Sequence, residues 1–140
     1  MRRWRAVTVA ASLALASCGG DSAPTTKAGW TAKYGESLEV FEKDLETARA
    51  TLSSLQRPDI LGTCTQLRDS LGEARKGLPV PDPASDRALR VTFDAVETGT
   101  TDCIEGARGP DIPRLEKSFR ELREARTLLE VAPRTIDNWK

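Results

Sequence analysis

Apolar side chains recur at alternating intervals of four and three residues along most of this chain. This spacing places one apolar side chain per turn on a single helix face, so it predicts amphipathic α-helices. The first helix is expected over residues 33–56, and Arg57-Pro58 ends it because the residue before a proline resists helical backbone angles. Its apolar seam consists of Tyr34, Leu38, Phe41, Leu45, Ala48, Leu52 and Leu55.

Three further segments carry the same pattern and predict helices over residues 59–76, 83–106 and 112–132. Asp82 is a suitable N-cap for the third predicted helix, with a proline in its first turn. Their apolar seams are Ile60, Leu61, Cys64, Leu67, Leu71, Ala74 and Leu78, then Leu89, Phe93, Val96, Thr100, Cys103 and Ala107, then Ile112, Leu115, Phe119, Leu122, Ala125 and Leu129. Four such helices predict an all-α, antiparallel up-down-up-down four-helix bundle over residues 33–132.

The start of the chain has the pattern of an export signal. Residues 1–5 contain three arginines and no acid, and residues 6–16 form an uncharged run dominated by alanine, valine and leucine. A basic start followed by a short apolar run and small residues is typical of a cleaved signal peptide. The run is about half of the roughly 20 residues that span a bilayer, which disfavours a permanent transmembrane helix.

The motif Leu15-Ala16-Ser17-Cys18 resembles the lipobox of bacterial lipoproteins. In that family the cysteine thiol receives a diacylglyceryl group, and a peptidase then cuts just before it. The resemblance implies that residues 1–17 are removed and that acylated Cys18 holds the protein on the extracytoplasmic side of the cell membrane. Two acyl chains, such as palmitate, anchor a protein stably where one does not. In the alternative interpretation, Cys18 is merely a small apolar residue of the signal.

Flexible segments are expected at both ends of the bundle. Residues 18–32 are interpreted as the lipidated N-terminus and a tether, because residues 19–29 are small and polar without a helical period. Trp30 then precedes the first helix, where packing against the bundle is expected and a lid or a membrane-interface contact is the alternative. Residues 133–140, with Trp139, form the expected C-terminal tail.

Two cysteines remain once Cys18 is acylated. Cys64 lies near the start of the second helix and Cys103 near the end of the third, and these ends meet in antiparallel neighbours. Exported domains tolerate disulfides, so we expect the two to pair, with two buried thiols as the alternative. Their distances from the connector differ by an offset of about 10 Å at 1.5 Å per residue, which the connector or a helix tilt has to absorb.

Composition argues against catalysis and against several partners. The chain contains no histidine, which removes the commonest general base, the Ser-His pair and most catalytic zinc sites. We therefore expect no enzyme, no cofactor and no metal. Loss of three of the 21 basic residues with residues 1–17 leaves 18 against 21 acidic ones, a net charge of −3. Such a mildly acidic domain argues against nucleic acid and against a polybasic membrane clamp.

Two local features leave alternatives open. Asp69 with Glu73, and less closely Glu39 with Asp44, share helix faces, which favours a solvated surface over the carboxylate pair of a hydrolase. Glycine and threonine surround both cysteines. The favoured explanation is that these small residues let the second and third helices approach for the disulfide, and the alternative is a polar opening that binds a ligand.

The chain as a whole resembles small actinobacterial lipoproteins of the cell envelope. The residues that carry this resemblance are the lipobox Leu15 to Cys18, Trp30, Tyr34, Cys64, Leu67, the turn 78–82 and Cys103. The resemblance implies an anchor in membrane lipid and brings no catalytic residues. Our leading hypothesis is a non-enzymatic protein-interaction or structural module with an envelope protein as partner. A binder or carrier of a small apolar or amphipathic ligand is the alternative, and a carboxylate-dependent hydrolase is the weaker one.

Overall fold

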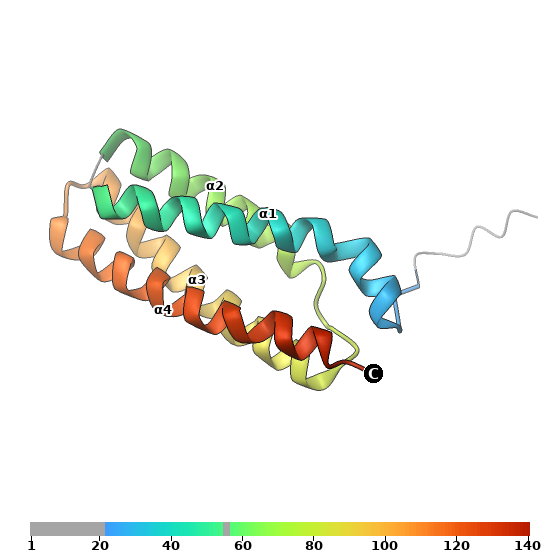
Figure 1. Ribbon diagram of the computed structural model, residues 1–140. Helices are drawn as coiled ribbons and strands as arrows, with labels where there is room; N and C mark the ends of the chain where they lie inside the picture. The colour runs from blue at the N-terminus through green and yellow to red at the C-terminus, as the bar shows by residue number, and fades with distance from the viewer. Residues whose placement is uncertain (1–21, 55–56) are drawn as a thin grey trace, which may run out of the picture.

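The computed structural model describes residues 22–54 and 57–140, which form four helices. These helices are α1 (Lys27–Ser54), α2 (Arg57–Arg75), α3 (Pro83–Arg108) and α4 (Ile112–Asp137). Successive helices run in opposite directions, and the start of α1 lies at the same end as the C-terminus (Figure 1). The predicted all-α four-helix bundle is therefore confirmed. The predicted signal peptide and Cys18 lie outside the described residues.

The predicted apolar seams supply the core of the bundle, apart from Leu55, which lies outside the described residues. Phe41 of α1 and Phe93 of α3 meet at its centre with ring centroids 5.2 Å apart and planes at 90°. This edge-to-face arrangement is the one that aromatic quadrupoles favour. The largest fully buried apolar side chains are Phe41, Phe93, Leu45, Leu52, Ile60, Leu67, Leu89, Leu115, Leu122 and Val96. All of them belong to the seams that the four-three spacing predicts.

The predicted disulfide joins α2 to α3. The Cα atoms of Cys64 and Cys103 lie 6.3 Å apart, and both side chains are fully buried. The connector from residue 76 to residue 82 runs on past the end of α2 before α3 begins, which provides the lengthwise offset that the residue counts require (Figure 1). Asp82 then caps α3, since its Oδ2 accepts a hydrogen bond of 2.8 Å from the backbone N–H of Ser85.

The four helices do not pack equally closely. In the described part of the chain, contacts between helices join α1 to α2, α2 to α3, α3 to α4 and α1 to α4; they are most extensive for α3 with α4 and sparsest for α1 with α4. Glycines of α3 explain why its contact with α4 is the most extensive. A Cβ atom on Gly99 would lie 2.7 Å from Leu122 Cδ2, and one on Gly106 would lie 3.1 Å from Leu115 Cδ2. The absence of these side chains lets α4 approach α3 closely.

The first helix begins earlier than predicted. It starts at Lys27, so the expectation of a flexible tether is wrong for residues 27–32. Thr26 acts as the cap, because its Oγ1 accepts a hydrogen bond of 3.1 Å from the Gly29 N–H. Trp30 lies one turn further and is only 3% exposed, so burial of this large ring stabilises a turn that is otherwise rich in poor helix formers.

The last helix also extends further than predicted. It continues through Pro133 to Asp137, so the expected tail over residues 133–140 is wrong for its first five residues. A proline inside a helix removes one backbone hydrogen bond. Ala132 and Ile136, on either side of Pro133, are buried against the core, and this packing holds the turn in helical form. No helix within residues 22–54 and 57–140 is long and apolar enough to cross a bilayer.

Candidate functional site: the groove between α1 and α4

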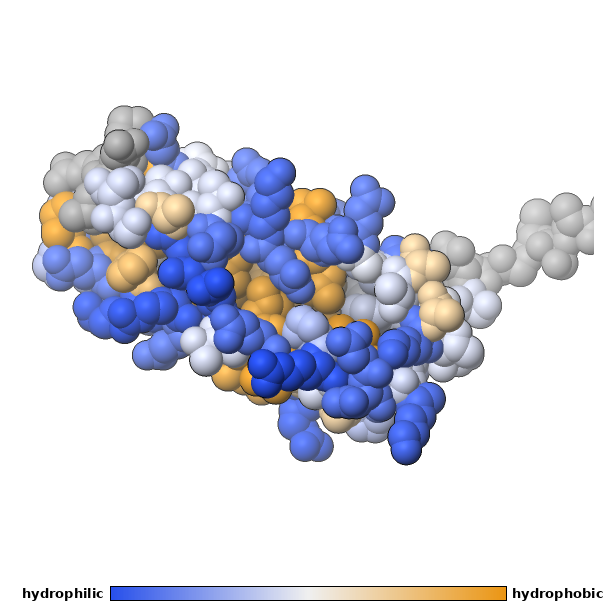
Figure 2. Space-filling model, in the orientation of Figure 1, coloured by the Kyte–Doolittle hydropathy of each residue, from blue (hydrophilic) through white to orange (hydrophobic). Residues whose placement is uncertain are grey.

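The loosely packed seam between α1 and α4 has a row of cavities along it. Cavities of about 280, 300 and 300 Å³ lie between these two helices. The first cavity lies near the start of α1 and is lined by Trp30 of α1 and Ile136 of α4. The last cavity lies near the end of α1 and is lined by Leu52 of α1 and Phe119 of α4. Figure 2 shows this face with hydrophobic surface in the middle and hydrophilic side chains around it. We call this row of cavities the α1–α4 groove.

Seam residues form the floor of the groove. Leu38 and Leu45 of α1 and Leu129 and Ile136 of α4 line the first two cavities, and each is at most 9% exposed. They belong to the core, and their outer edges face the groove because the two helices leave space there. A concave apolar floor with a few polar groups around it is the usual form of a binding site.

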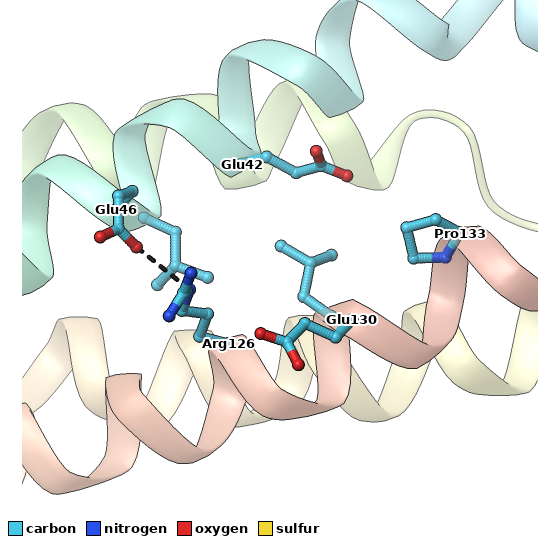
Figure 3. A pocket seen from close by; sticks show the side chains of 7 residues that line it. Glu42, Glu46, Arg126, Glu130 and Pro133 are labelled. Atoms are coloured by element: carbon cyan, nitrogen blue, oxygen red, sulfur yellow. Dashed lines mark ion pairs between the residues drawn. The ribbon is translucent and has the colours of Figure 1, made fainter.

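The rim of the groove is acidic. Figure 3 shows Glu42 on α1 and Glu130 on α4 on opposite sides of the middle cavity. Next to them, Glu46 Oε2 lies 3.2 Å from Arg126 Nε across the seam. The same carboxylate oxygen lies 2.8 Å from Arg49 Nη1 on its own helix. The middle cavity thus has three carboxylates on its wall, one of which is already shared between two guanidinium groups.

Glu42 has the most perturbed electrostatic environment on this rim. Its partial burial raises the pKa of the carboxyl above the ordinary value of 4.5, and the negative charge of Glu39 raises it further. Within residues 22–54 and 57–140, no lysine or arginine forms an ion pair with Glu42. The ionised form therefore lacks compensation, and a cation in the groove would favour it.

Contacts at the start of α1 close one end of the groove. Trp30 Nε1 donates a hydrogen bond of 2.8 Å to the carbonyl of Gly77, and its ring centroid lies 5.9 Å from that of Tyr34. Lys27 Nζ donates a hydrogen bond of 2.8 Å to the carbonyl of Asp137 at the end of α4. The expectation that Trp30 packs against the bundle is confirmed, although it does so from inside α1.

A second charged cluster joins α3 to α4. Asp102 is 7% exposed and accepts hydrogen bonds of 2.7 Å from Lys117 Nζ and 2.9 Å from Arg114 Nε. The Lys117 hydrogen bond lowers the pKa of Asp102, with the Arg114 bond acting in the same direction. Burial raises the pKa of the neighbouring Glu121, whose Oε1 lies 3.2 Å from Lys117 Nζ. Lys117 and Arg114 compensate the charge of Asp102 and connect the two helices, whereas the other carboxylate oxygen of Glu121, Oε2, is buried without a hydrogen-bond partner.

The small residues around the cysteines have a different role from the expected one. Gly99 faces Leu122 of α4, and a Cβ atom on Gly62 would meet no heavy atom within 4 Å. The explanation that these two glycines let α2 and α3 approach for the disulfide is therefore wrong. A cavity of about 240 Å³ does lie between α2 and α3, lined in part by Thr100 and Thr101.

The structure places the two predicted carboxylate pairs in different surroundings. Asp69 and Glu73 are exposed, and Glu73 pairs with Lys76 at 2.7 Å. The expectation of a solvated surface is wrong for Asp44, which is 6% exposed and accepts a hydrogen bond of 2.9 Å from Gln66 Nε2. This bond connects α1 to α2 and compensates for the burial of the carboxylate.

Neither metal chemistry nor known relatives add to the assignment. In the part of the chain that the structure describes, no cluster of three or more His, Cys, Asp or Glu side chains is arranged to hold a metal ion. No family model, curated protein or solved structure matches the chain. The geometry and charge of the α1–α4 groove and the pattern of the first 18 residues are therefore the features that point to a function.

Proposed function

We propose that this protein is an exported lipoprotein, anchored on the extracytoplasmic side of the cell membrane by acylated Cys18. Its helical bundle serves as a non-enzymatic module that binds a protein of the cell envelope. The anchor is supported by the lipobox-like Leu15-Ala16-Ser17-Cys18 and the basic and apolar segments before it.

The open α1–α4 groove is the observation that carries the binding function. It combines a buried leucine floor with a rim of carboxylates on both helices, and it lies on the outside of a bundle braced by a disulfide. A rigid scaffold that presents a long apolar groove is well suited to a partner, because little conformational freedom is lost on binding.

A carrier of a small amphipathic ligand is the second candidate. Two neighbouring cavities, of about 300 and 280 Å³, share Glu42 and Pro133 on their walls. Each is at the lower limit of the volumes that small molecules occupy in proteins. An amphipathic cation would place its apolar part on the leucine floor and its charge beside Glu42.

Membrane fractionation tests the anchor. Cys18→Ala removes the acyl acceptor, so we expect the protein to move from the membrane fraction to the soluble fraction or to accumulate uncleaved. The matched control is Ser22→Ala, four residues further on, which keeps Leu15 to Cys18 intact and should leave the protein acylated in the membrane. Unchanged acylation and fractionation of Cys18→Ala would exclude this mode of attachment.

Site-directed crosslinking tests the binding function. A photoactivatable benzophenone side chain is placed at Glu130 in the groove or at the exposed Glu124 on another face of the same helix. In intact envelopes, we expect a discrete protein adduct from position 130 and none from position 124. Equal labelling from both positions, or none from position 130, would contradict a partner in the groove.

A further inference from the structure

We propose that the α1–α4 groove binds a basic amphipathic helix of the partner protein, with the helix's cations over the half of the groove nearest the start of α1. This inference rests on the proposed function, since it specifies the partner chemistry of the same groove.

The length of the groove favours a helix over a small molecule. Its cavities extend from Trp30 in α1 to Leu52, which at 1.5 Å per residue is about 33 Å along the helix axis. A small molecule fills one cavity, whereas a helix of about 20 residues covers all three. Successive apolar side chains on one face of that helix would enter successive cavities, as in other helix-in-groove complexes.

The distribution of charge along the groove determines the sign of the partner. Carboxylates line the first two cavities at Glu39, Glu42, Glu46, Glu130 and Asp137. Among the described residues that line these two cavities, Arg126 is the one cation, and it already pairs with a rim carboxylate. A partner with lysine or arginine on the flanks of its apolar face is complementary to this rim, whereas an acidic partner is repelled.

The third cavity has a different character, which gives the bound helix a direction. Leu52, Leu115 and Phe119 supply apolar surface there, and Glu116 and Arg120 contribute opposite charges. The negative potential is therefore concentrated at one end of the groove. The basic residues of the partner helix belong over that end, and its uncharged residues belong over the phenylalanine.

Arg126 opposes binding of such a helix. Its ion pair with Glu46 crosses the seam at the edge of the middle cavity, as Figure 3 shows, and the two side chains are 49% and 56% exposed. An exposed pair of this kind is weak and readily opened. Loss of the arginine charge removes a like charge from the site and leaves Glu46 with Arg49 as its one guanidinium partner among the described residues, so Arg126→Gln should strengthen binding.

Peptide titration tests the inference. The full chain with Cys18→Ala, which carries no acyl group, is titrated with a fluorescent amphipathic peptide of leucine and lysine about 22 residues long, which matches the length of the groove, and with the same peptide carrying glutamate for lysine. We expect the lysine peptide to bind at least about tenfold more tightly, and added salt to weaken it. Glu42→Gln with Glu130→Gln should weaken it by about tenfold, and Arg126→Gln should strengthen it severalfold.

The control is Glu124→Gln, which removes one negative charge, half of that removed by the double groove variant, from another face of α4 and should change the affinity less than about twofold. Circular dichroism melting of each variant establishes that it is folded.

Equal affinity for both peptides, or equal effects of the groove and control substitutions, would overturn the proposal that a basic helix binds in the groove. If the crosslink at Glu130 forms but the lysine peptide does not bind, the groove remains a binding site and the basic helix is excluded. If a fluorescent alkylamine binds there and the lysine peptide does not, the carrier is supported instead.

Discussion

The close packing of α4 against α3 at Gly99 provides a test with a definite sign. Gly99→Ala would place a methyl carbon 2.7 Å from Leu122 Cδ2 and 2.9 Å from Leu122 Cγ. Carbon atoms in contact prefer a separation of about 3.5–4.0 Å. Leu122 is fully buried, and the Ser118 hydroxyl donates a hydrogen bond of 2.6 Å to the Gly99 carbonyl, so neither helix moves without cost.

The expected magnitude is the difference of two opposing effects. Overpacking of a close-packed core costs about 1–3 kcal/mol, and the short contacts with a branched, buried side chain place this site in the upper half of that range. Alanine is the better helix former by about 1 kcal/mol, which offsets part of the cost. We therefore expect Gly99→Ala to lower the free energy of unfolding by about 1–2 kcal/mol.

Gly62→Ala is the matched control, because this glycine also lies inside a helix but a Cβ atom there meets nothing within 4 Å. Only the propensity effect applies, so this variant should be more stable by up to about 1 kcal/mol. Urea unfolding followed by far-ultraviolet circular dichroism, with the disulfide intact, measures both variants. A Gly99→Ala variant at least as stable as the parent would refute the close approach. Leu122→Ala should then lower the free energy of unfolding by less in the Gly99→Ala background than in the parent, because the two sites are in contact.

Two further predictions concern the cross-links between helices. Cys64 and Cys103 are 39 residues apart, so reduction of their disulfide should lower the free energy of unfolding by about 4 kcal/mol in the chain-entropy model. Equal urea midpoints with and without reductant would contradict this. Asp102→Asn should cost about 1–2 kcal/mol at pH 7, since it removes charge-assisted hydrogen bonds from Lys117 and Arg114. Because these bonds lower the pKa of Asp102, its stabilising effect is complete above the ordinary pKa of 3.8 and is lost as the pH falls through the lower value in the folded protein. The difference in free energy of unfolding between the parent and Asp102→Asn should therefore be smaller at pH 3 than at pH 7. A difference that does not change with pH would contradict a stabilising ion pair at Asp102.

The periodicity of the chain was sufficient to predict the four helices and their buried faces. Side chains such as Leu45, Leu67 and Leu122 are buried because the three-four spacing keeps them on one face over many turns. The pairing of Cys64 with Cys103 was also predictable, since antiparallel topology brings those two helix ends together. These features depend on local pattern and connectivity, which a single sequence contains.

The helix ends were harder to predict because tertiary contacts decide them. Trp30 follows a segment of weak helix formers, and its hydrogen bond to the Gly77 carbonyl becomes visible only when the connector is in place. Pro133 is an ordinary end signal for a helix, yet burial of Ala132 and Ile136 carries the helix past it. In both cases packing outweighs a local preference of the backbone.

The candidate site was the least accessible feature, although part of its signal is present in the sequence. Glu39, Glu42 and Glu46 recur every three or four residues beside the seam of the first helix, which places them in one row. Such a row is normally an ordinary solvated face. It becomes the rim of a groove here because the neighbouring seam is open, and the spacing of residues along one helix does not reveal the distance to the next.

The open seam follows from how the fourth helix divides its contacts between two neighbours. Gly99 and Gly106 let α4 come close to α3, and the ion pairs of Asp102 add a polar connection on the same side. Toward α1, the one ion pair in the described residues is that of Glu46 with Arg126, which is exposed on both sides. A rigid helix cannot fit closely against both partners unless the side chains fill the remaining space. The close contact with α3 therefore leaves the space along α1 in which we place the partner helix.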